Sequence, residues 1–346
     1  MTEAEAGLHV AVTGPTGDLG RAFLRALENV QEVERVVGMA RRPFDPAEEG
    51  LTKTEYLRGD VLERRSVEAL VEEADVVVHL AFSIFGTGDE ARKVNLEGSR
   101  NVFEVALASA RRLVYTSSVA AYGFHRSNPE VLTENVPARG VDDLAYSRAK
   151  ADAETLLMNL ARAEPDCDVY VFRPCIVAGP TAQMLIDKIP YIRFGEKVPA
   201  PLKRIFGAVS MLRPVVPDPG TPIQLVHEDD VAQALTLATV GRGAPGVYNL
   251  AGEGTITLTD LAHALGWYAI PLPDLVVDAT TSIVSALPHL PSEAQWVNAI
   301  RVPVLMDCTK ARRELGWQPV YDTLATLGET VAGARRRGVV PWPGTA

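Results

Sequence analysis

The stretch Thr13-Gly14-Pro15-Thr16-Gly17-Asp18-Leu19-Gly20 decides the fold of this chain. It directly follows an apolar run, residues 8–12, and precedes a segment with apolar residues at helical spacing. A strand, a tight glycine turn and a helix together point free backbone N–H groups and the positive end of a helix dipole at an anion. Glycines in the turn let a pyrophosphate approach without a Cβ in the way. The alternative interpretation is an ordinary loop that happens to be rich in glycine.

The composition is that of a globular protein without a basic surface. The chain has 346 residues, of which 47% are hydrophobic and 23% charged, and its formal net charge is -10. This length allows one large α/β unit or two lobes. Because nucleic acids and anionic membranes both attract a basic footprint, we exclude them as partners. The chain also shows no apolar segment near the ~20 residues that span a bilayer.

Cysteine usage predicts a reducing environment and no metal. The three cysteines, Cys167, Cys175 and Cys308, are odd in number and lack CxxC spacing. This pattern argues against a disulfide framework and against a zinc site. The acidic first residues contain no hydrophobic signal core. We therefore predict a cytoplasmic protein.

Apolar runs alternate with helical patterns along the first half of the chain, which predicts a parallel sheet with right-handed crossovers. The expected fold class is α/β, a Rossmann-type doubly wound parallel sheet with a smaller, interleaved C-terminal substrate lobe. The helix over 66–73 is expected to begin with Ser66 as its N-cap. His79 lies inside an apolar strand, and we interpret it as a core residue and not as a ligand. The expected strands are 8–12, 35–40, 55–58, 76–81, 113–118 and 169–174, and the expected helices are 19–30, 66–73, 90–108 and 146–163.

The end of the second strand bears on the choice of cofactor. In a dinucleotide fold this position meets the adenosine ribose, where an acidic side chain binds a 2′-hydroxyl and an arginine accommodates a 2′-phosphate. Here Arg41 and Arg42 stand in place of an acidic residue. This favours NADP(H). NAD(H) stays open as the alternative, because the arginines can also be solvated charges at a strand end. Asp60, after the third strand, is expected near the adenine amino group.

Two further groups of polar residues are candidates for a ligand-binding or catalytic site. Thr116, Ser117 and Ser118 end the fifth strand, at the edge where open α/β sheets place their ligands. Tyr146 and Lys150 stand four apart on an expected helix, so they share one face about one turn apart.

These motifs, in this order, resemble the extended short-chain dehydrogenase/reductases, often grouped as NAD-dependent epimerases/dehydratases. The resemblance covers about residues 8–320. It rests on Thr13-Gly14-x-x-Gly17-x-x-Gly20, Gly59-Asp60-Val61, His79-Leu80-Ala81, Val94-Asn95-Leu96-Glu97-Gly98, Ser117-Ser118 before Ala121-Tyr122-Gly123, Tyr146-x-x-x-Lys150, Arg173-Pro174, His227-x-Asp229-Asp230, Tyr248-Asn249-Leu250 and Lys310-Ala311-x-x-Glu314-Leu315-Gly316-Trp317.

The resemblance implies roles for individual residues. Tyr146 would be the general acid/base, Lys150 would favour its phenolate and bind the nicotinamide ribose, and Ser118 would hold the substrate oxygen. Ser118 is preferred over Ser117 because it stands four residues before Tyr122. Lowering a tyrosine pKa by about three units requires about 4 kcal/mol of differential stabilisation. The residues expected to bind the cofactor are Gly14, Thr16, Gly17, Asp18, Leu19, Gly20, Arg41, Arg42, Asp60, Val61, Leu80, Ala81, Phe82, Asn95, Thr116, Tyr146, Lys150 and Pro174.

The chain departs from the sugar-nucleotide members of that family at two positions. Cys175-Ile176 follows Arg173-Pro174 where those members carry an Asn, and Ile223 stands where they carry a diphosphate-binding Arg. An isoleucine cannot supply the charged fork that binds phosphate. The apolar segments around 178–220 and 271–302, which include Met184, Phe194 and Trp296, also suggest a less polar substrate.

The sequence therefore predicts an NADP(H)-preferring oxidoreductase acting on a carbonyl or alcohol carbon of a small, fairly apolar metabolite. An epimerase or dehydratase with a retained cofactor, and a catalytically silent dinucleotide-binding sensor, are kept as alternatives. The expected domains are a dinucleotide-binding unit of 1–176 plus about 223–252 and a substrate lobe of 177–222 and 253–346. A homodimer through the helix that holds Tyr146 is expected from the family alone.

Overall fold

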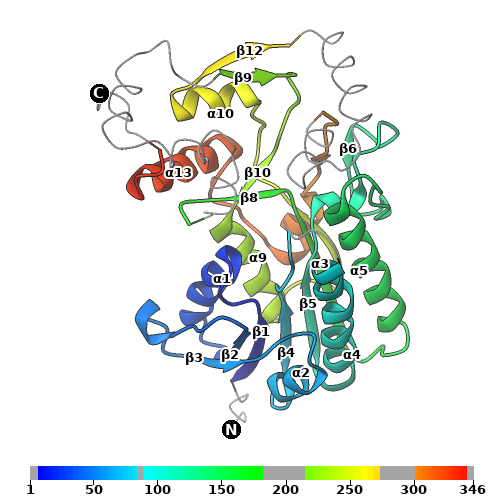
Figure 1. Cartoon of the computed structure of the whole chain (residues 1–346). Coiled ribbons are helices and arrows are strands. Elements are labelled where there is room, and N and C mark those ends of the chain that lie inside the picture. Colours follow the sequence, from blue (N-terminus) through cyan, green and yellow to red (C-terminus); the bar gives the residue numbers. More distant parts are fainter. Residues whose placement is uncertain (1–6, 85–88, 182–214, 273–300, 341–346) are drawn as a thin grey trace.

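The computed structural model describes residues 7–84, 89–181, 215–272 and 301–340. Its centre is a seven-stranded sheet in the order β11-β7-β5-β4-β1-β2-β3, and every strand pair in it is parallel. Helices cover both faces of this sheet (Figure 1). The prediction of a Rossmann-type doubly wound sheet is confirmed. The strands are β1 (Leu8–Thr13), β2 (Val33–Ala40), β3 (Thr54–Arg58), β4 (Val76–His79), β5 (Arg112–Thr116), β7 (Asp168–Pro174) and β11 (Gly246–Leu250).

The helices form two layers that are recognised by their contacts. On one face α1 (Asp18–Glu28) packs against α9 (Glu228–Thr239). On the other face α4 (Ser99–Ser109) packs against both α2 (Arg64–Val71) and α5 (Ala145–Ala161). The middle residues of the inner strands are apolar and buried, as expected for a sheet that is covered on both faces.

A smaller set of elements lies above the carboxyl edge of the sheet (Figure 1). Two short parallel pairs, β8 with β10 and β9 with β12, lead into it, and α13 packs against α10 and β10. The bounds are β8 (Ile176–Ala178), β9 (Val215–Asp218), β10 (Leu225–His227), β12 (Tyr268–Pro271), α10 (Leu258–Leu265) and α13 (Thr323–Arg336). A further short parallel pair joins β6 (Val131–Leu132) to β13 (Leu305–Met306), and η1 (Ala47–Glu49), η3 (Val119–Tyr122) and η5 (Ala311–Leu315) are short helical turns.

The domain boundaries stay a prediction, but the packing of the C-terminal part is informative. Met306, Cys308 and Trp317 are buried with the main core cluster beside the sheet. Ile256, Leu265 and their neighbours form a separate cluster under α13. The apolar residues Met184, Phe194 and Trp296 lie outside the described residues.

Three local expectations need correction. The second helix begins at Arg64 with Glu63 as its N-cap, so Ser66 is already inside the first turn and is not the cap. The expected helix 90–108 is divided into α3 (Asp89–Lys93), a π-helical turn η2 (Val94–Gly98) and α4. The strands expected to reach 81 and 118 end at His79 and Thr116, because the chain leaves the sheet there to form the loops of the candidate site.

Candidate active site

The glycine turn after β1 is shaped for close backbone approach. Gly14 has a φ of +75°, and a Cβ on it would lie 2.8 Å from the Ala81 nitrogen. A Cβ on Gly20 would lie 2.3 Å from the Gly14 oxygen, so α1 can approach the turn only with glycine at this position. Gly17 is the N-cap of α1, and no side chain caps that helix end. Thr16, Gly17 and Leu19 are half-buried, which leaves this helix N-terminus accessible to an anion.

The loop after β4 lies beside the glycine turn. Leu80, Ala81 and Phe82 follow the strand, and the Ala81 N–H donates to Thr13 Oγ1 at 3.3 Å. His79 lies beneath them and contacts Thr13 Oγ1 at 2.7 Å through Nδ1 and Ser99 Oγ at 3.0 Å through Nε2. Burial lowers the pKa of His79 to about 3, so the imidazole is neutral. The interpretation of His79 as a core residue is confirmed.

The ends of β2 and β3 carry the residues predicted for the adenosine. The Arg41 side chain is 60% exposed, and its Nη1 lies 4.0 Å from Asp60 Oδ2. Asp60 Oδ1 accepts a hydrogen bond from the Leu62 N–H at 3.0 Å, so one carboxylate oxygen also shapes its own turn. Arg42 is exposed, whereas Val61 is buried against Gly98. Arginine and aspartate therefore face the same exposed edge.

Ser118 and Tyr146 meet at the carboxyl end of β5. Their side chains are hydrogen-bonded, and Ser118 Oγ also accepts from the Ala120 N–H at 3.2 Å, which fixes the hydroxyl as the N-cap of η3. Burial raises the pKa of Tyr146 to about 12, and the hydrogen bond with Ser118 offsets only part of this rise. The phenol is therefore protonated near neutral pH.

Lys150 is 3% exposed and lies one turn along α5 from Tyr146. Its Nζ donates to the Thr116 backbone oxygen at 2.8 Å and lies 5.9 Å from the centroid of the Tyr146 ring. Burial lowers the pKa of Lys150 to about 7, and the charge of Glu154 opposes that fall. Only part of the Lys150 side chains are therefore in the charged ammonium form at neutral pH, which is the form that would favour the Tyr146 phenolate.

Phe82 and Asn95 complete this end of the site. The Phe82 ring centroid lies 3.5 Å from Lys150 Nζ, and the ring meets that of Tyr146 edge-on at 5.8 Å. Asn95 is buried in η2, where its Oδ1 accepts from the Ser83 N–H at 2.7 Å and its Nδ2 donates to the Ser83 oxygen at 3.0 Å. Asn95 therefore holds the loop that carries Phe82. Pro174 ends β7, next to β5 in the sheet.

The sequence reasoning did not find a buried ion pair behind the site. Arg173 Nη2 and Glu154 Oε2 are 2.6 Å apart, and the Ser117 hydroxyl donates to Glu154 Oε1. The available signal was Glu154 itself, an acidic residue four positions after Lys150 on an expected helix. Its partners could not be identified, since Ser117 follows β5 and Arg173 lies in β7, both far from Glu154 in the sequence.

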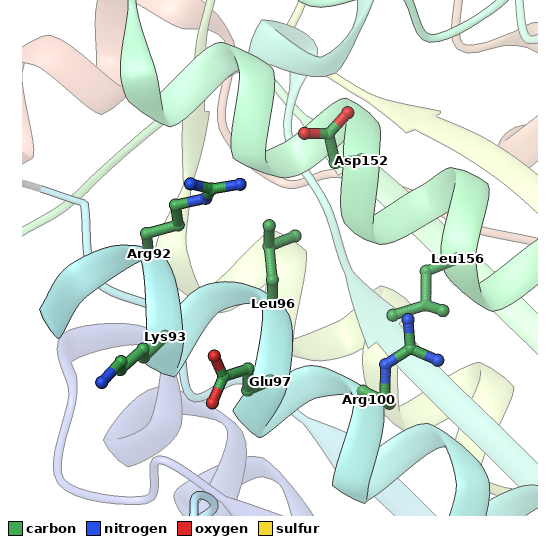
Figure 2. Close-up of a pocket in the computed structure, with 7 residues that line it drawn as sticks. All are labelled: Arg92, Lys93, Leu96, Glu97, Arg100, Asp152 and Leu156. Atoms are coloured by element: carbon green, nitrogen blue, oxygen red, sulfur yellow. The ribbon is translucent and has the colours of Figure 1, made fainter. Parts of the chain in front are cut away.

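A hollow of about 560 Å³ lies on the outer side of α5. Figure 2 shows Arg92 of α3 and Asp152 of α5 on opposite walls, with Leu96 between them. Asp152 and Leu156 point away from the face of α5 that carries Tyr146 and Lys150. This hollow is therefore a surface feature of the α3–α4–α5 side and not the predicted catalytic pocket.

The residues at the carboxyl edge fit a nicotinamide dinucleotide. A buried hydroxyl, Thr116 Oγ1, finds no hydrogen-bond partner among the described residues. It adjoins the backbone oxygen that Lys150 binds, and the glycine cradle described above lies at the end of β1, separated from β5 by β4. Within the described ranges, three or more His, Cys, Asp or Glu side chains do not gather into a metal site, and the helices are too short or too polar to cross a membrane.

Comparison with known proteins agrees with this architecture. A model of the NAD dependent epimerase/dehydratase family matches residues 10–251. An uncharacterised protein of Mycobacterium tuberculosis is 26% identical over 340 residues, covering 96% of this chain and 85% of that protein. Sterol demethylase protein B of Methylococcus capsulatus is 33% identical over 176 residues, covering 49% of this chain and 51% of the relative. The structure of dTDP-glucose 4,6-dehydratase from Bacillus anthracis, in complex with NAD, matches with a TM-score of 0.69 at 17% identity, over 95% of this chain and 97% of that chain.

Proposed function

Because the chain belongs to the NAD dependent epimerase/dehydratase family, we propose that it is a cytoplasmic, NADP(H)-preferring oxidoreductase. Its substrate is a small, fairly apolar metabolite that reacts at a carbonyl or alcohol carbon. The observation that carries the proposal is the convergence of Ser118, Tyr146 and Lys150 where the carboxyl end of β5 meets the first turns of α5. This constellation lies on the same sheet edge as the glycine turn.

The residues of the site have separable roles in this proposal. The bound nicotinamide dinucleotide supplies the hydride acceptor or donor. Ser118 holds the substrate oxygen, and Tyr146 exchanges a proton with it at the phenol oxygen. Lys150 binds the nicotinamide ribose and favours the phenolate by its positive charge. Because burial raises the pKa of Tyr146, a nearby positive charge would be needed to favour its phenolate.

The preference for NADP(H) rests on Arg41 and Arg42. Both are exposed at the end of β2, where a 2′-phosphate would meet them. Arg41 lies 4.0 Å from the nearest Asp60 oxygen, a separation at which the pair is weak and the guanidinium stays available.

An apolar substrate is supported by the surroundings of Ile223. This residue pairs with Ile256 through two backbone hydrogen bonds and packs against the apolar cluster that includes Leu225 and Leu327. A diphosphate would find no guanidinium there. The relative from Methylococcus capsulatus is named as a sterol demethylase protein, which agrees with an apolar substrate class.

The proposal is tested by following nucleotide oxidation with a panel of carbonyl compounds. The panel runs from a nucleotide sugar through small ketones to a sterol ketone, each offered with NADPH and with NADH. We expect net oxidation of NADPH with the apolar members. Turnover of the nucleotide sugar alone, with no net change in the nucleotide, would contradict it.

The epimerase or dehydratase is the second candidate, and the family description favours it. It predicts that the purified protein carries tightly bound dinucleotide and shows no net redox change. Release of the cofactor by denaturation, followed by its identification, separates the two candidates. A silent sensor would bind dinucleotide but turn over no member of the panel.

We also propose a homodimer that pairs the surface formed by α3, η2 and the outer face of α5. A two-fold interface brings the same patch of both subunits together, so it needs self-complementary charge and apolar area. Arg92 and Asp152 supply opposite charges, and Leu96 and Leu156 supply apolar area (Figure 2). Sedimentation analysis should show a dimer that Leu156→Glu converts to a monomer.

A further inference from the structure

The end of β5 contacts α5 at three successive positions. The Thr116 backbone oxygen accepts a hydrogen bond from Lys150. The Ser117 hydroxyl donates one to Glu154. The Ser118 side chain is hydrogen-bonded with that of Tyr146. The three α5 residues are spaced by four, so they form one stripe along the helix. The contacts of Tyr146 and Lys150 belong to the proposed chemistry, whereas that of Glu154 is not part of it.

Glu154 is buried as completely as a core residue. Its side chain is 4% exposed, and its carboxylate accepts hydrogen bonds from Arg173 Nε at 3.0 and 3.1 Å and from Nη2 at 2.6 Å. The guanidinium of Arg173 also lies 4.4 Å from the Tyr122 ring centroid, and its Nη1 donates to the Val136 oxygen at 3.2 Å. A buried pair with this many hydrogen bonds holds α5 at a fixed position against β5 and β7.

The ammonium of Lys150 faces few charged groups. From β5 the Tyr115 hydroxyl lies 3.5 Å away, and from β4 the neutral His79 is electrostatically coupled to it. From its own helix it faces Tyr146 and Glu154. Burial raises the pKa of Tyr115 well above its ordinary value, and Tyr146 is protonated as well. Among the described groups that face Lys150, Glu154 is therefore the acidic side chain, and its charge opposes the effect of burial on the pKa of Lys150.

We propose that Glu154 is a positioning residue of the catalytic site, whose carboxylate favours the ammonium form of Lys150 and which fixes the position of α5 against the end of β5. The charge requirement rests on the proposed function, since it is Tyr146 that uses the ammonium. Arg173 and Ser117 hold the carboxylate in place. Without the negative charge, burial alone governs Lys150 and the ammonium loses its proton more easily.

The test observes Lys150 directly and needs neither cofactor nor substrate. Protein labelled with ¹³C at the lysine ε-carbons is titrated by NMR, and the Lys150 signal is assigned by its loss in Lys150→Met. We expect a midpoint near pH 7 in the wild type, since its pKa is lowered to about 7. Glu154→Gln should lower this midpoint by about one pH unit. An unchanged midpoint would overturn the proposal.

Two control variants separate charge from packing. Glu154→Asp keeps the charge and should keep the midpoint close to that of the wild type. Ser117→Ala removes one hydrogen bond and no charge, so it should lower the melting temperature without moving the midpoint. If both lower the midpoint as much as Glu154→Gln, the effect comes from packing and the proposal fails.

A second variant covers the case in which Glu154→Gln does not fold because Arg173 is left unpaired. The double variant Glu154→Gln/Arg173→Gln removes both charges of the ion pair, so no uncompensated charge is buried. Since loss of the Arg173 cation by itself favours the ammonium, the reference for this variant is Arg173→Gln, which lacks the same cation and keeps the carboxylate. We expect a lower Lys150 midpoint in the double variant than in Arg173→Gln, and equal midpoints overturn the proposal. In an active protein the rising limb of the turnover–pH profile should move to higher pH in Glu154→Gln. A lowered Lys150 midpoint in a protein without redox activity would overturn the proposed function and leave the coupling of Glu154 to Lys150 intact.

Discussion

The two ends of the candidate site differ in how they control charge. At the β2–β3 end Arg41 is 60% exposed, and its carboxylate neighbour is 4.0 Å away. At the β5–α5 end Lys150 is 3% exposed, and the nearby Glu154–Arg173 pair is held by hydrogen bonds as short as 2.6 Å. Both ends belong to one sheet edge, yet one is open to water and the other is closed to it.

This difference predicts different kinds of selectivity. Water and salt screen exposed charges, so each contributes little to binding and loses its effect at high ionic strength. Buried groups shift their pKa values by burial and by single neighbours, so one substitution changes the chemistry strongly. Substitutions at the β5–α5 end should therefore have large effects on turnover, and those at the β2–β3 end small effects on cofactor choice.

The largest effect is expected for Tyr146→Phe. The substitution removes the hydroxyl that exchanges the substrate proton, so turnover should fall at least about a hundredfold. Cofactor affinity should stay nearly unchanged, as measured by titration of the protein with NADPH. Tyr268→Phe serves as the matched control, because this tyrosine is 47% exposed on β12. Equal turnover in the wild type and Tyr146→Phe would remove the phenol from its role.

Lys150→Met should act through the pH profile. Loss of the cation removes a group that favours the phenolate, so the apparent pKa of Tyr146 in the loaded protein rises. The rising limb of alcohol oxidation should move up by one to two pH units, about tenfold in rate at a fixed pH for each unit. An unmoved limb, with only a lower plateau, would mean that Lys150 acts by position and not by charge.

The same variant has a distinct signature in the stability of the cofactor-free protein. Burial lowers the pKa of Lys150 from 10.5 to about 7, so below pH 7 the folded chain carries a buried cation that the unfolded chain exposes to water. This penalty is lost as pH rises from 7 towards 10.5, because the folded chain releases the proton first. Lys150→Met should therefore gain most in melting temperature relative to the wild type at or below pH 7, and least near pH 10. A difference that does not change with pH would contradict the lowered pKa.

Gly20→Ala tests the cradle that lies between the two ends. Its Cβ would lie 2.3 Å from the Gly14 oxygen and 2.9 Å from Pro15, so α1 must move away from the turn. We expect about a tenfold loss of affinity for either nucleotide, together with a lower melting temperature. Gly328→Ala is the matched control. Gly328 lies in α13 with open space around it, so this change should raise stability by up to about 1 kcal/mol.

The outline of the fold could be predicted because its signals are local. Apolar runs mark the buried strands, and the glycines mark the turn where α1 meets β1. His79 was recognised as a core residue because it interrupts an apolar strand, and the structure gives it two hydroxyl partners. Each of these patterns spans fewer than about ten residues, so one sequence contains enough information.

The buried hydrogen bonds and ion pair behind the site could not be predicted, because they join segments that are distant in the sequence. Ser117 is 37 positions from Glu154, which is 19 positions from Arg173, and their contact follows from β5 and β7 being neighbours. The Ser66 cap was wrong for a similar reason. The helix begins at Arg64, two residues before Ser66, and the Arg64 guanidinium forms an ion pair with Glu104 of α4. Tertiary contacts thus decide details that residue preferences leave open.

The smallest effect is expected at the exposed end, for Arg41→Ala. A solvated guanidinium contributes about 1 kcal/mol to binding a phosphate, which corresponds to about a fivefold loss of NADPH affinity. NADH has no 2′-phosphate, so its affinity should change less, and the difference should shrink at high salt because exposed charges are screened. Titration of both nucleotides at low and high ionic strength measures this. Arg162→Ala, at the far end of α5, makes the same change in net charge away from the site and should affect neither nucleotide. Equal losses for NADPH and NADH in Arg41→Ala would show that the arginine supports the loop and not the phosphate, and the selectivity would then have to come from Arg42 or be absent.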